Sequence, residues 1–265
     1  MRARAILAVL SAAAALFLTA CGTGGGIDER SSESGGAASS AEGTLTVYAA
    51  ASLTTSFDRL AEEFEAEYPG VDVTVDYGGS TGLAQRLQEG ARADVFASAD
   101  ERTMQRLTDS DLPSGESEIF ASNTLTLVVP EGNPADISGL DDLRKDGVNF
   151  VRCAPEVPCG AAADELEKAN GVALSPVSSE LSVTDVLGKV TSGQADAGLV
   201  YVTDAKAAGG RVETIEVPHS QDVVNYYPVV TFPDSPNATA AREFVDALTS
   251  ERGQTILRDE GFGAP

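Results

Sequence analysis

Four short loops rich in small polar residues are the positions in this sequence best suited to chemistry. Each precedes a segment with helical spacing of apolar residues, and together they cover residues 51–54, 78–82, 157–160 and 181–184. The first turn of a helix has unpaired N–H groups and the positive end of the helix dipole, so it attracts anions. No lysine or arginine lies in these loops. The pattern predicts a cage of neutral dipoles around a compact oxyanion.

The candidate donors differ in kind from loop to loop. Ser52 and Ser80 each offer a hydroxyl and a backbone N–H, whereas Cys159 and Val183 offer only the backbone N–H as a strong donor. Tyr201, at the end of a predicted strand, adds a phenolic hydroxyl. Any one of these loops alone is better explained as a helix cap or a turn, which is the commonest use of such residues. The convergence of four loops favours a binding site.

Strand and helix patterns alternate around these loops. Predicted strands cover residues 44–49, 71–77, 94–98, 125–130, 148–152 and 197–202, and predicted helices cover 57–68, 83–87, 103–107, 161–169, 186–190, 238–248 and 254–260. This alternation is typical of an α/β fold with a parallel sheet flanked by helices.

The chain is expected to pass between two halves of this fold twice. The first crossing lies near Ser122 and the second near Val224, and the last two helices have apolar spacing suited to covering the first half. We therefore expect two α/β lobes: residues 44–122 plus 225–265 form lobe 1, and residues 123–224 form lobe 2.

The N-terminus has the features of a targeting segment. Arg2 and Arg4 precede an apolar stretch, residues 5–17, that is too short to span a membrane as a mature helix. This stretch is followed by Leu18-Thr19-Ala20-Cys21, which has a small residue directly before the cysteine and resembles a bacterial lipobox. An ordinary signal peptide with an incidental cysteine is the alternative. We expect residues 1–20 to be a signal peptide and residues 21–43 a lipidated Cys21 followed by a flexible Gly/Ser/Ala-rich tether. The protein would then lie outside the cell membrane and be anchored to it.

Charge and cysteine content restrict the partners further. The net charge of −23 excludes non-specific nucleic-acid binding and argues against docking on anionic lipid. Cys153 and Cys159 remain if Cys21 carries lipid, and an exported protein permits either a disulfide or a free pair. Their spacing and the single histidine suit no usual zinc site.

Two other functions fit parts of the sequence. Ser80 lies in a nucleophile-elbow pattern and His219 follows downstream, as in a serine hydrolase, but the strand before Ser80 alternates polar and apolar residues, unlike a central hydrolase strand. Tyr226 and Tyr227 resemble the paired phenolates of ferric-ion receptors, but adjacent strand residues point in opposite directions. We expect neither function.

Four blocks along the chain carry a family resemblance. They are residues 47–53, 79–82, 93–100 and 198–205, and their order and spacing are similar to those of the periplasmic molybdate-binding proteins of ABC transporters. The resemblance covers nearly all of residues 44–265. It implies a two-lobed type II periplasmic binding-protein fold, no enzymatic activity and no cofactor.

The resemblance also implies a ligand and its partners. Molybdate or tungstate would be held by neutral hydrogen bonds from Ser52, Ser80, Cys159, Val183 and Tyr201, with Ser182 and Thr184 as alternative donors beside Val183. Sulfate or phosphate is the alternative ligand within the same fold, and cage size must discriminate between sulfate and molybdate. The expected partner is a membrane ABC permease, and we expect a monomer.

Overall fold

A computed structural model describes residues 42–110, 112 and 114–265, all within one unit, Ser39–Pro265. The predicted signal peptide, Cys21 and residues 21–41 of the tether lie outside the described residues. In the described part of the chain, no helix has the length and apolar character needed to cross a membrane.

Strands and helices alternate through most of the chain. The strands are β1 (Gly43–Ala50), β2 (Val71–Gly78), β3 (Val95–Ala97), β4 (Glu118–Pro130), β5 (Phe150–Cys153), β6 (Ser178–Glu180), β7 (Ala197–Tyr201), β8 (Val212–Ile215) and β9 (Val224–Thr231). The α-helices are α1 (Thr54–Glu67), α2 (Ser80–Gln88), α3 (Glu101–Thr108), α4 (Pro158–Ala169), α5 (Val183–Thr191), α6 (Val202–Ala208), α7 (Ala238–Thr249) and α8 (Glu251–Glu260). Short 3₁₀ turns are η1 (Ala51–Leu53), η2 (Leu140–Arg144), η3 (Gly209–Arg211) and η4 (Ser220–Asp222).

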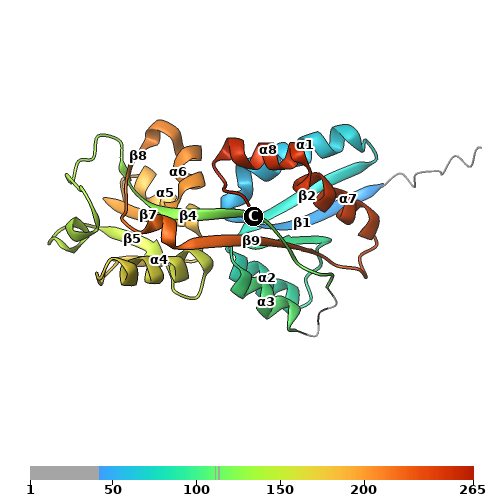
Figure 1. The fold of residues 1–265 in the computed structure, drawn as a ribbon, viewed down its shortest axis with the longest axis horizontal. Helices are drawn as coiled ribbons and strands as arrows, with labels where there is room; N and C mark the ends of the chain where they lie inside the picture. Colours follow the sequence, from blue (N-terminus) through green and yellow to red (C-terminus); the bar gives the residue numbers. More distant parts are fainter. Residues whose placement is uncertain (1–41, 111, 113) are drawn as a thin grey trace, which may run out of the picture. The chain divides into compact units, whose positions relative to one another are not determined.

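The sheet is mixed, in the order β2-β1-β3-β9-β4-β7-β5-β6, with β8 also paired to β4 (Figure 1). Strands β2, β1 and β3 are parallel, as are β7, β5 and β6, whereas β4 and β9 run antiparallel to their neighbours. Residues 118–124 of β4 pair with β9, and from Leu125 onward β4 pairs with β7 and then β8. The long strand β4 therefore connects the two parallel groups.

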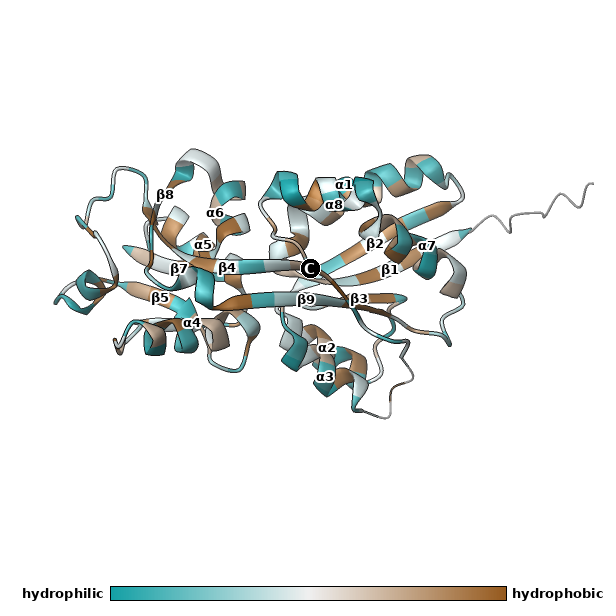
Figure 2. Ribbon diagram, viewed as in Figure 1, coloured by the Kyte–Doolittle hydropathy of each residue, from teal (hydrophilic) through white to brown (hydrophobic). Residues whose placement is uncertain are grey.

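Helices cover both faces of each half of the sheet (Figure 1). In one half, α1, α7 and α8 lie on one face and α2 and α3 on the other; in the second half, α5 and α6 lie opposite α4. Helix α1 buries Phe57, Leu60 and Phe64 against the sheet, which is the face predicted from their spacing. Figure 2 shows the same division, with apolar residues along the strands and hydrophilic residues on the outer turns of the helices.

The structure agrees with the sequence for every predicted element, with differences in extent. Strand β4 begins at Glu118 rather than at residue 125, and β6, α6, β8 and β9 were not among the predicted elements, although a crossing was expected near Val224. The predicted parallel sheet is found in β2-β1-β3 and in β7-β5-β6, but the sheet as a whole is mixed because β4 and β9 pair antiparallel. Helices α7 and α8 pack on each other and on α1, as their apolar spacing predicts.

Candidate functional site

Loops at the carboxyl ends of β1, β2, β3, β5, β6 and β7 meet around one small cavity. Ligand sites in α/β sheets form at this edge, where helix N-termini also point. The cavity volume is about 20 Å³, close to the space of one or two water-sized groups. None of its lining residues is charged: Ala50, Ala51, Ser52, Gly78, Gly79, Ser80, Ala99, Val157, Pro158, Cys159, Leu181, Ser182, Val183 and Tyr201.

All five candidate ligands from the sequence line this cavity. Ser52 lies in η1, and Tyr201 lies at the end of β7. Ser80, Cys159 and Val183 lie at the starts of α2, α4 and α5. Their role as ligands stays a prediction. Their proximity follows from the topology, since each loop leaves the same edge of the sheet.

Each of the two serine hydroxyls already has one hydrogen-bond partner within the protein. The backbone N–H of Ala99 donates to Ser80 Oγ over 3.0 Å. Ser52 Oγ lies 2.9 Å from the Tyr227 hydroxyl. Because an N–H can only donate, Ser80 Oγ acts there as acceptor and its own proton is free for another partner.

Tyr201 presents a buried hydroxyl without a partner. Its side chain is 1% exposed, and the hydroxyl has no hydrogen-bond partner within the described residues. Burial, together with the neighbouring Tyr227 and acidic groups, raises the pKa of Tyr201 well above its usual value, so the hydroxyl keeps its proton. A buried polar group normally has a partner. This hydroxyl is therefore a donor available to a ligand.

Cys159 lies on a loop closed by a disulfide. Cys153 and Cys159 are bonded, with 5.6 Å between their Cα atoms. Cys159 is the second residue of α4, after Pro158, so its N–H has no partner within the helix. A Cβ on Gly160 would lie 1.8 Å from the carbonyl oxygen of Ala154, so only glycine fits beside the closed loop.

The N-cap residue of helix α5, Ser182, already has hydrogen-bond partners within the first turn. Ser182 Oγ accepts from the backbone N–H of Asp185 over 3.3 Å and lies 3.0 Å from Thr184 Oγ1. The side chains of Ser182 and Thr184 therefore bond within the first turn, and Thr184 does not line the cavity. The N–H of Val183, the first helical residue, has no such intrahelical partner.

One ionisable group is buried next to the cavity. Asp204 Oδ2 accepts from the backbone N–H of Tyr201 over 3.1 Å. Burial raises the pKa of Asp204 to about 7. Near neutral pH the carboxyl is thus partly protonated, which limits negative charge behind the cavity wall.

Comparison with known proteins agrees with the fold. The bacterial extracellular solute-binding protein family matches residues 45–263. The molybdate-binding protein ModA of Mycobacterium tuberculosis is 42% identical over 257 residues, 97% of each chain, and that of Escherichia coli is 31% identical over 231 residues, 83% of this chain and 89% of the relative. The Azotobacter vinelandii periplasmic molybdate-binding protein structure superposes with a TM-score of 0.72 at 19% identity, covering 83% of this chain and 99% of that one.

The chain belongs to the bacterial extracellular solute-binding protein family. Its fold is the mixed α/β fold of periplasmic binding proteins, and it is not an enzyme. The family resemblance predicted from the four sequence blocks is confirmed.

The geometry agrees with this membership rather than with a hydrolase. His219 lies on the exposed segment before η4, where its Nδ1 is 2.8 Å from Asp222 Oδ2. No hydrogen bond joins it to Ser80 among the described residues, so the residues expected of a nucleophile–base pair are not brought together.

The paired-phenolate arrangement of an iron receptor is also absent. Tyr227 is fully buried, whereas Tyr226 is 41% exposed, because adjacent residues of β9 point to opposite faces. Within the described residues, no group of three or more His, Cys, Asp or Glu side chains is arranged to hold a metal ion.

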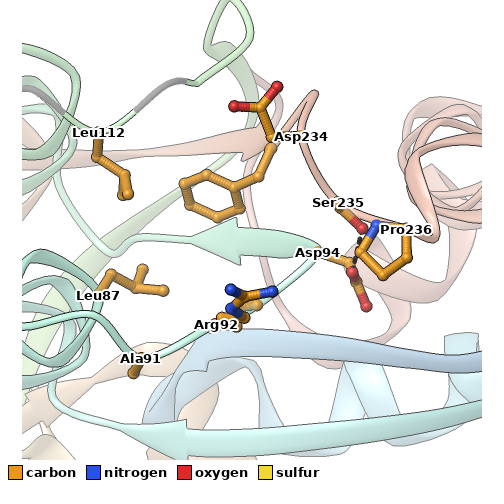
Figure 3. Close-up of a pocket in the computed structure, with 10 residues that line it drawn as sticks. Leu87, Ala91, Arg92, Asp94, Leu112, Asp234, Ser235 and Pro236 are labelled. Carbon is orange, nitrogen blue, oxygen red and sulfur yellow. Dashed lines mark hydrogen bonds between the residues drawn. The ribbon is translucent and has the colours of Figure 1, made fainter.

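A second cavity of about 260 Å³ lies between β3, α2 and the segment after β9 (Figure 3). Its walls include Leu87, Leu112 and Phe232, and its buried carboxylate, Asp94, accepts from the backbone N–H of Thr46 over 2.6 Å and from Ser235. Its main buried polar group is thus already satisfied, unlike Tyr201. The lining of this cavity includes the cationic Arg92 and the acidic Asp94 and Asp234, whereas the cavity formed by the loops has an uncharged lining.

Sequence reasoning missed two residues of the site. Ala99 lines the cavity and its N–H bonds Ser80, while Tyr227 lies directly behind Ser52. Ala99 follows strand β3 at the same sheet edge as the other loops, and that position was the available signal. For Tyr227, a long-range contact from β9, no local signal existed.

Proposed function

We propose that this chain captures molybdate, and also tungstate, and delivers it to an ABC permease. The observation that carries the proposal is the small uncharged cavity into which neutral donors converge, with the Tyr201 hydroxyl buried and unpartnered. Two relatives at 42% and 31% identity are molybdate-binding proteins. Buried donors without partners favour an occupant that accepts hydrogen bonds on every side.

The donor set favours a fully ionised oxyanion. The hydroxyls of Ser52, Ser80 and Tyr201 and the backbone N–H groups of Cys159 and Val183 would hold the four oxygens. Hydrogen bonds to a charged acceptor are roughly twice as strong as neutral ones. A protonated anion such as hydrogenphosphate carries a hydrogen that needs an acceptor, and this wall offers few.

Two lobes of a type II binding protein would close on the anion. Lobe 1 comprises residues 44–122 and 225–265 and lobe 2 residues 123–224, with β4 and β9 as the two crossings. Contacts across the cavity support a closed state: Thr81 Oγ1 donates to the carbonyl oxygen of Glu156 over 3.1 Å, and Arg102 lies 3.5 Å from the same oxygen. Opening would break these contacts and release the anion.

The N-terminus would hold this receptor at the membrane. Residues 1–20 are proposed as a signal peptide, Cys21 as the lipidated residue and residues 21–43 as a tether. The receptor is proposed to act as a monomer outside the cell membrane and to meet the permease there. Family membership supports an extracytoplasmic location.

Thermal unfolding of the purified protein with each candidate ligand tests the proposal. Molybdate, tungstate, sulfate, phosphate and Fe(III) are compared at equal concentrations. A ligand at about 1,000 times its dissociation constant adds about 4 kcal/mol of stability, which a melt resolves. Molybdate and tungstate alone should raise the melting temperature. A shift with only sulfate, phosphate or iron would mean that the ligand is wrong, and no shift at all would reject the anion site.

A further inference from the structure

Tyr227 lies directly behind the cavity wall and does not line the cavity. Its ring is fully buried and packs edge-on against Phe120, Tyr201 and Phe262, with centroids 5.4 to 6.3 Å apart. Its hydroxyl lies 2.9 Å from Ser52 Oγ. The ring contacts fix the position of the hydroxyl independently of the hydrogen bonds it makes.

A second polar side chain approaches the same hydroxyl. Asn123 Nδ2 donates to the Tyr227 hydroxyl over 3.4 Å and to Thr203 Oγ1 over 2.8 Å. Its Oδ1 accepts from the backbone N–H of Thr124 over 3.0 Å. Because a backbone N–H requires an oxygen opposite it, this last bond fixes which end of the amide is nitrogen.

The number of protons then determines the direction of each bond. The Asn123 nitrogen can only donate, so the Tyr227 oxygen accepts from it. Tyr227 has one proton to donate: the Tyr201 hydroxyl also lies nearby but makes no hydrogen bond among the described residues, whereas Ser52 Oγ lies 2.9 Å away in hydrogen-bond geometry. The Tyr227 hydroxyl therefore donates to Ser52, and the Ser52 proton is free to point elsewhere. Burial raises the pKa of Tyr227, so the phenol keeps this proton.

Ser80 has the same arrangement with a different donor. There the backbone N–H of Ala99 occupies the hydroxyl oxygen. In both cases a fixed donor within the protein uses a lone pair of the serine oxygen and leaves the serine proton for the cavity. Without such a donor, a serine hydroxyl can rotate and present its oxygen, which repels an anion.

We propose that Tyr227, backed by Asn123, is a positioning residue that makes the Ser52 hydroxyl a donor into the cavity. The inference rests on the proposed oxyanion-binding function and adds to it a residue that need not touch the ligand. Tyr227 and Asn123 lie on β9 and β4, and Thr203 lies on α6. The direction of the Ser52 proton is thus set by the strands that join the two parallel groups of the sheet.

The first test is Tyr227→Phe, with molybdate binding measured by titration calorimetry. The ring packing remains and only the hydroxyl is lost, so the dissociation constant should rise about tenfold, the equivalent of one hydrogen bond to a charged group. Tyr226→Phe is the matched control, because Tyr226 is the neighbouring tyrosine on the same strand and is exposed. It should bind like the wild type. Equal affinity in Tyr227→Phe and the wild type would overturn the inference.

A double-mutant cycle separates positioning from packing. If Tyr227 acts through Ser52, Tyr227→Phe should cause no further loss of affinity in a Ser52→Ala background, whereas its effect should add to that of Ser80→Ala. Additive effects in both backgrounds would mean that Tyr227 acts by packing alone. If Tyr227→Phe does not fold, Asn123→Leu replaces it in the same cycle with the same expectation.

Failure of this inference is distinct from failure of the proposed function. If wild-type protein gives no heat with molybdate, the proposed ligand is wrong and the positioning role for molybdate falls with it. If the wild type binds and the Ser52 cycle is additive, the ligand stands and only the role of Tyr227 is rejected.

Discussion

Single hydroxyl groups determine what the cavity can hold. Tyr201 Oη has no partner among the described residues, and Ser80 Oγ is already used as an acceptor. Exposed carboxylates far from the cavity are screened within about 10 Å in 0.1 M salt. The net charge of −23 is therefore compatible with binding an anion through nearby neutral donors.

Replacing Tyr201 with phenylalanine should shift stability and binding in opposite directions. The unliganded protein loses a buried hydroxyl without a partner, so its free energy of unfolding should rise by about 1 kcal/mol. Molybdate binding loses a donor, so its dissociation constant should rise about tenfold. Urea unfolding and titration calorimetry measure the two quantities. A less stable variant with unchanged affinity would contradict this account of Tyr201.

Asp204 should make stability depend on pH. Its pKa of about 7 in the folded protein exceeds the usual 3.8, so between about pH 4 and 7 the folded protein holds a proton that the unfolded chain has lost. The free energy of unfolding should therefore fall as pH rises through this window, by about 4 kcal/mol in total, and level off above it.

Asp204→Asn keeps an acceptor for the Tyr201 N–H and removes this titration. Urea unfolding at pH 5 and pH 8 should show that the higher pH lowers the free energy of unfolding of the wild type more than that of Asp204→Asn. Asp141→Asn is the matched control, because Asp141 is 86% exposed and should follow the wild type. Parallel pH profiles for wild type and Asp204→Asn would show that burial does not raise this pKa.

At the scale of elements, the site depends on how closely the loops after β2 and β6 approach. A Cβ on Gly79 would lie 2.2 Å from the carbonyl oxygen of Leu181, so any side chain must push the loops apart. Gly82 provides the contrast, because nothing lies within 4 Å of its Cβ position. Both glycines belong to the same loop–helix segment.

Gly79→Ala should therefore weaken molybdate binding on the order of tenfold, since hydrogen bonds weaken steeply once donors are displaced. Gly82→Ala should bind normally and stabilise α2 slightly, by up to about 1 kcal/mol. Calorimetric titration of both variants measures the difference. Equal affinities would show that the two loops do not need this close approach.

The disulfide supports another element of the site, the loop that precedes α4. It closes a loop with a sequence separation of 6, for which the chain-entropy estimate is about 2 kcal/mol. Replacing both Cys153 and Cys159 with alanine should lower the free energy of unfolding by about this amount. The N–H of residue 159 remains, so molybdate binding should weaken only moderately. Unchanged urea unfolding in the double variant would contradict a stabilising role.

At the scale of the whole molecule, the sequence predicted local elements better than long-range pairing. The apolar spacing of α1 and the loops before α2, α4 and α5 are local patterns, and the structure has them at the predicted places. The extension of β4 to Glu118 depends on antiparallel pairing with β9, about a hundred residues later in the chain. Local periodicity carries no information about such a partner.

The same limit applies to the candidate site. Five lining residues could be named from the sequence because they begin helices or end a strand at one edge of the sheet. Tyr227 and Asn123 could not, since their contact with Ser52 exists only once β4 and β9 lie side by side. Residues that shape a site from behind are set by topology rather than by motif.

The most direct test of the account is a crystal structure with molybdate, with data collected at the molybdenum absorption edge. We predict one strong anomalous peak inside the cavity, with Ser52, Ser80 and Tyr201 hydroxyls and the N–H groups of Cys159 and Val183 at about 2.7 to 3.1 Å from the oxygens of the anion. No lysine or arginine should contact the anion. A peak elsewhere, or an anion bound by cationic side chains, would contradict molybdate binding by neutral donors in this cavity.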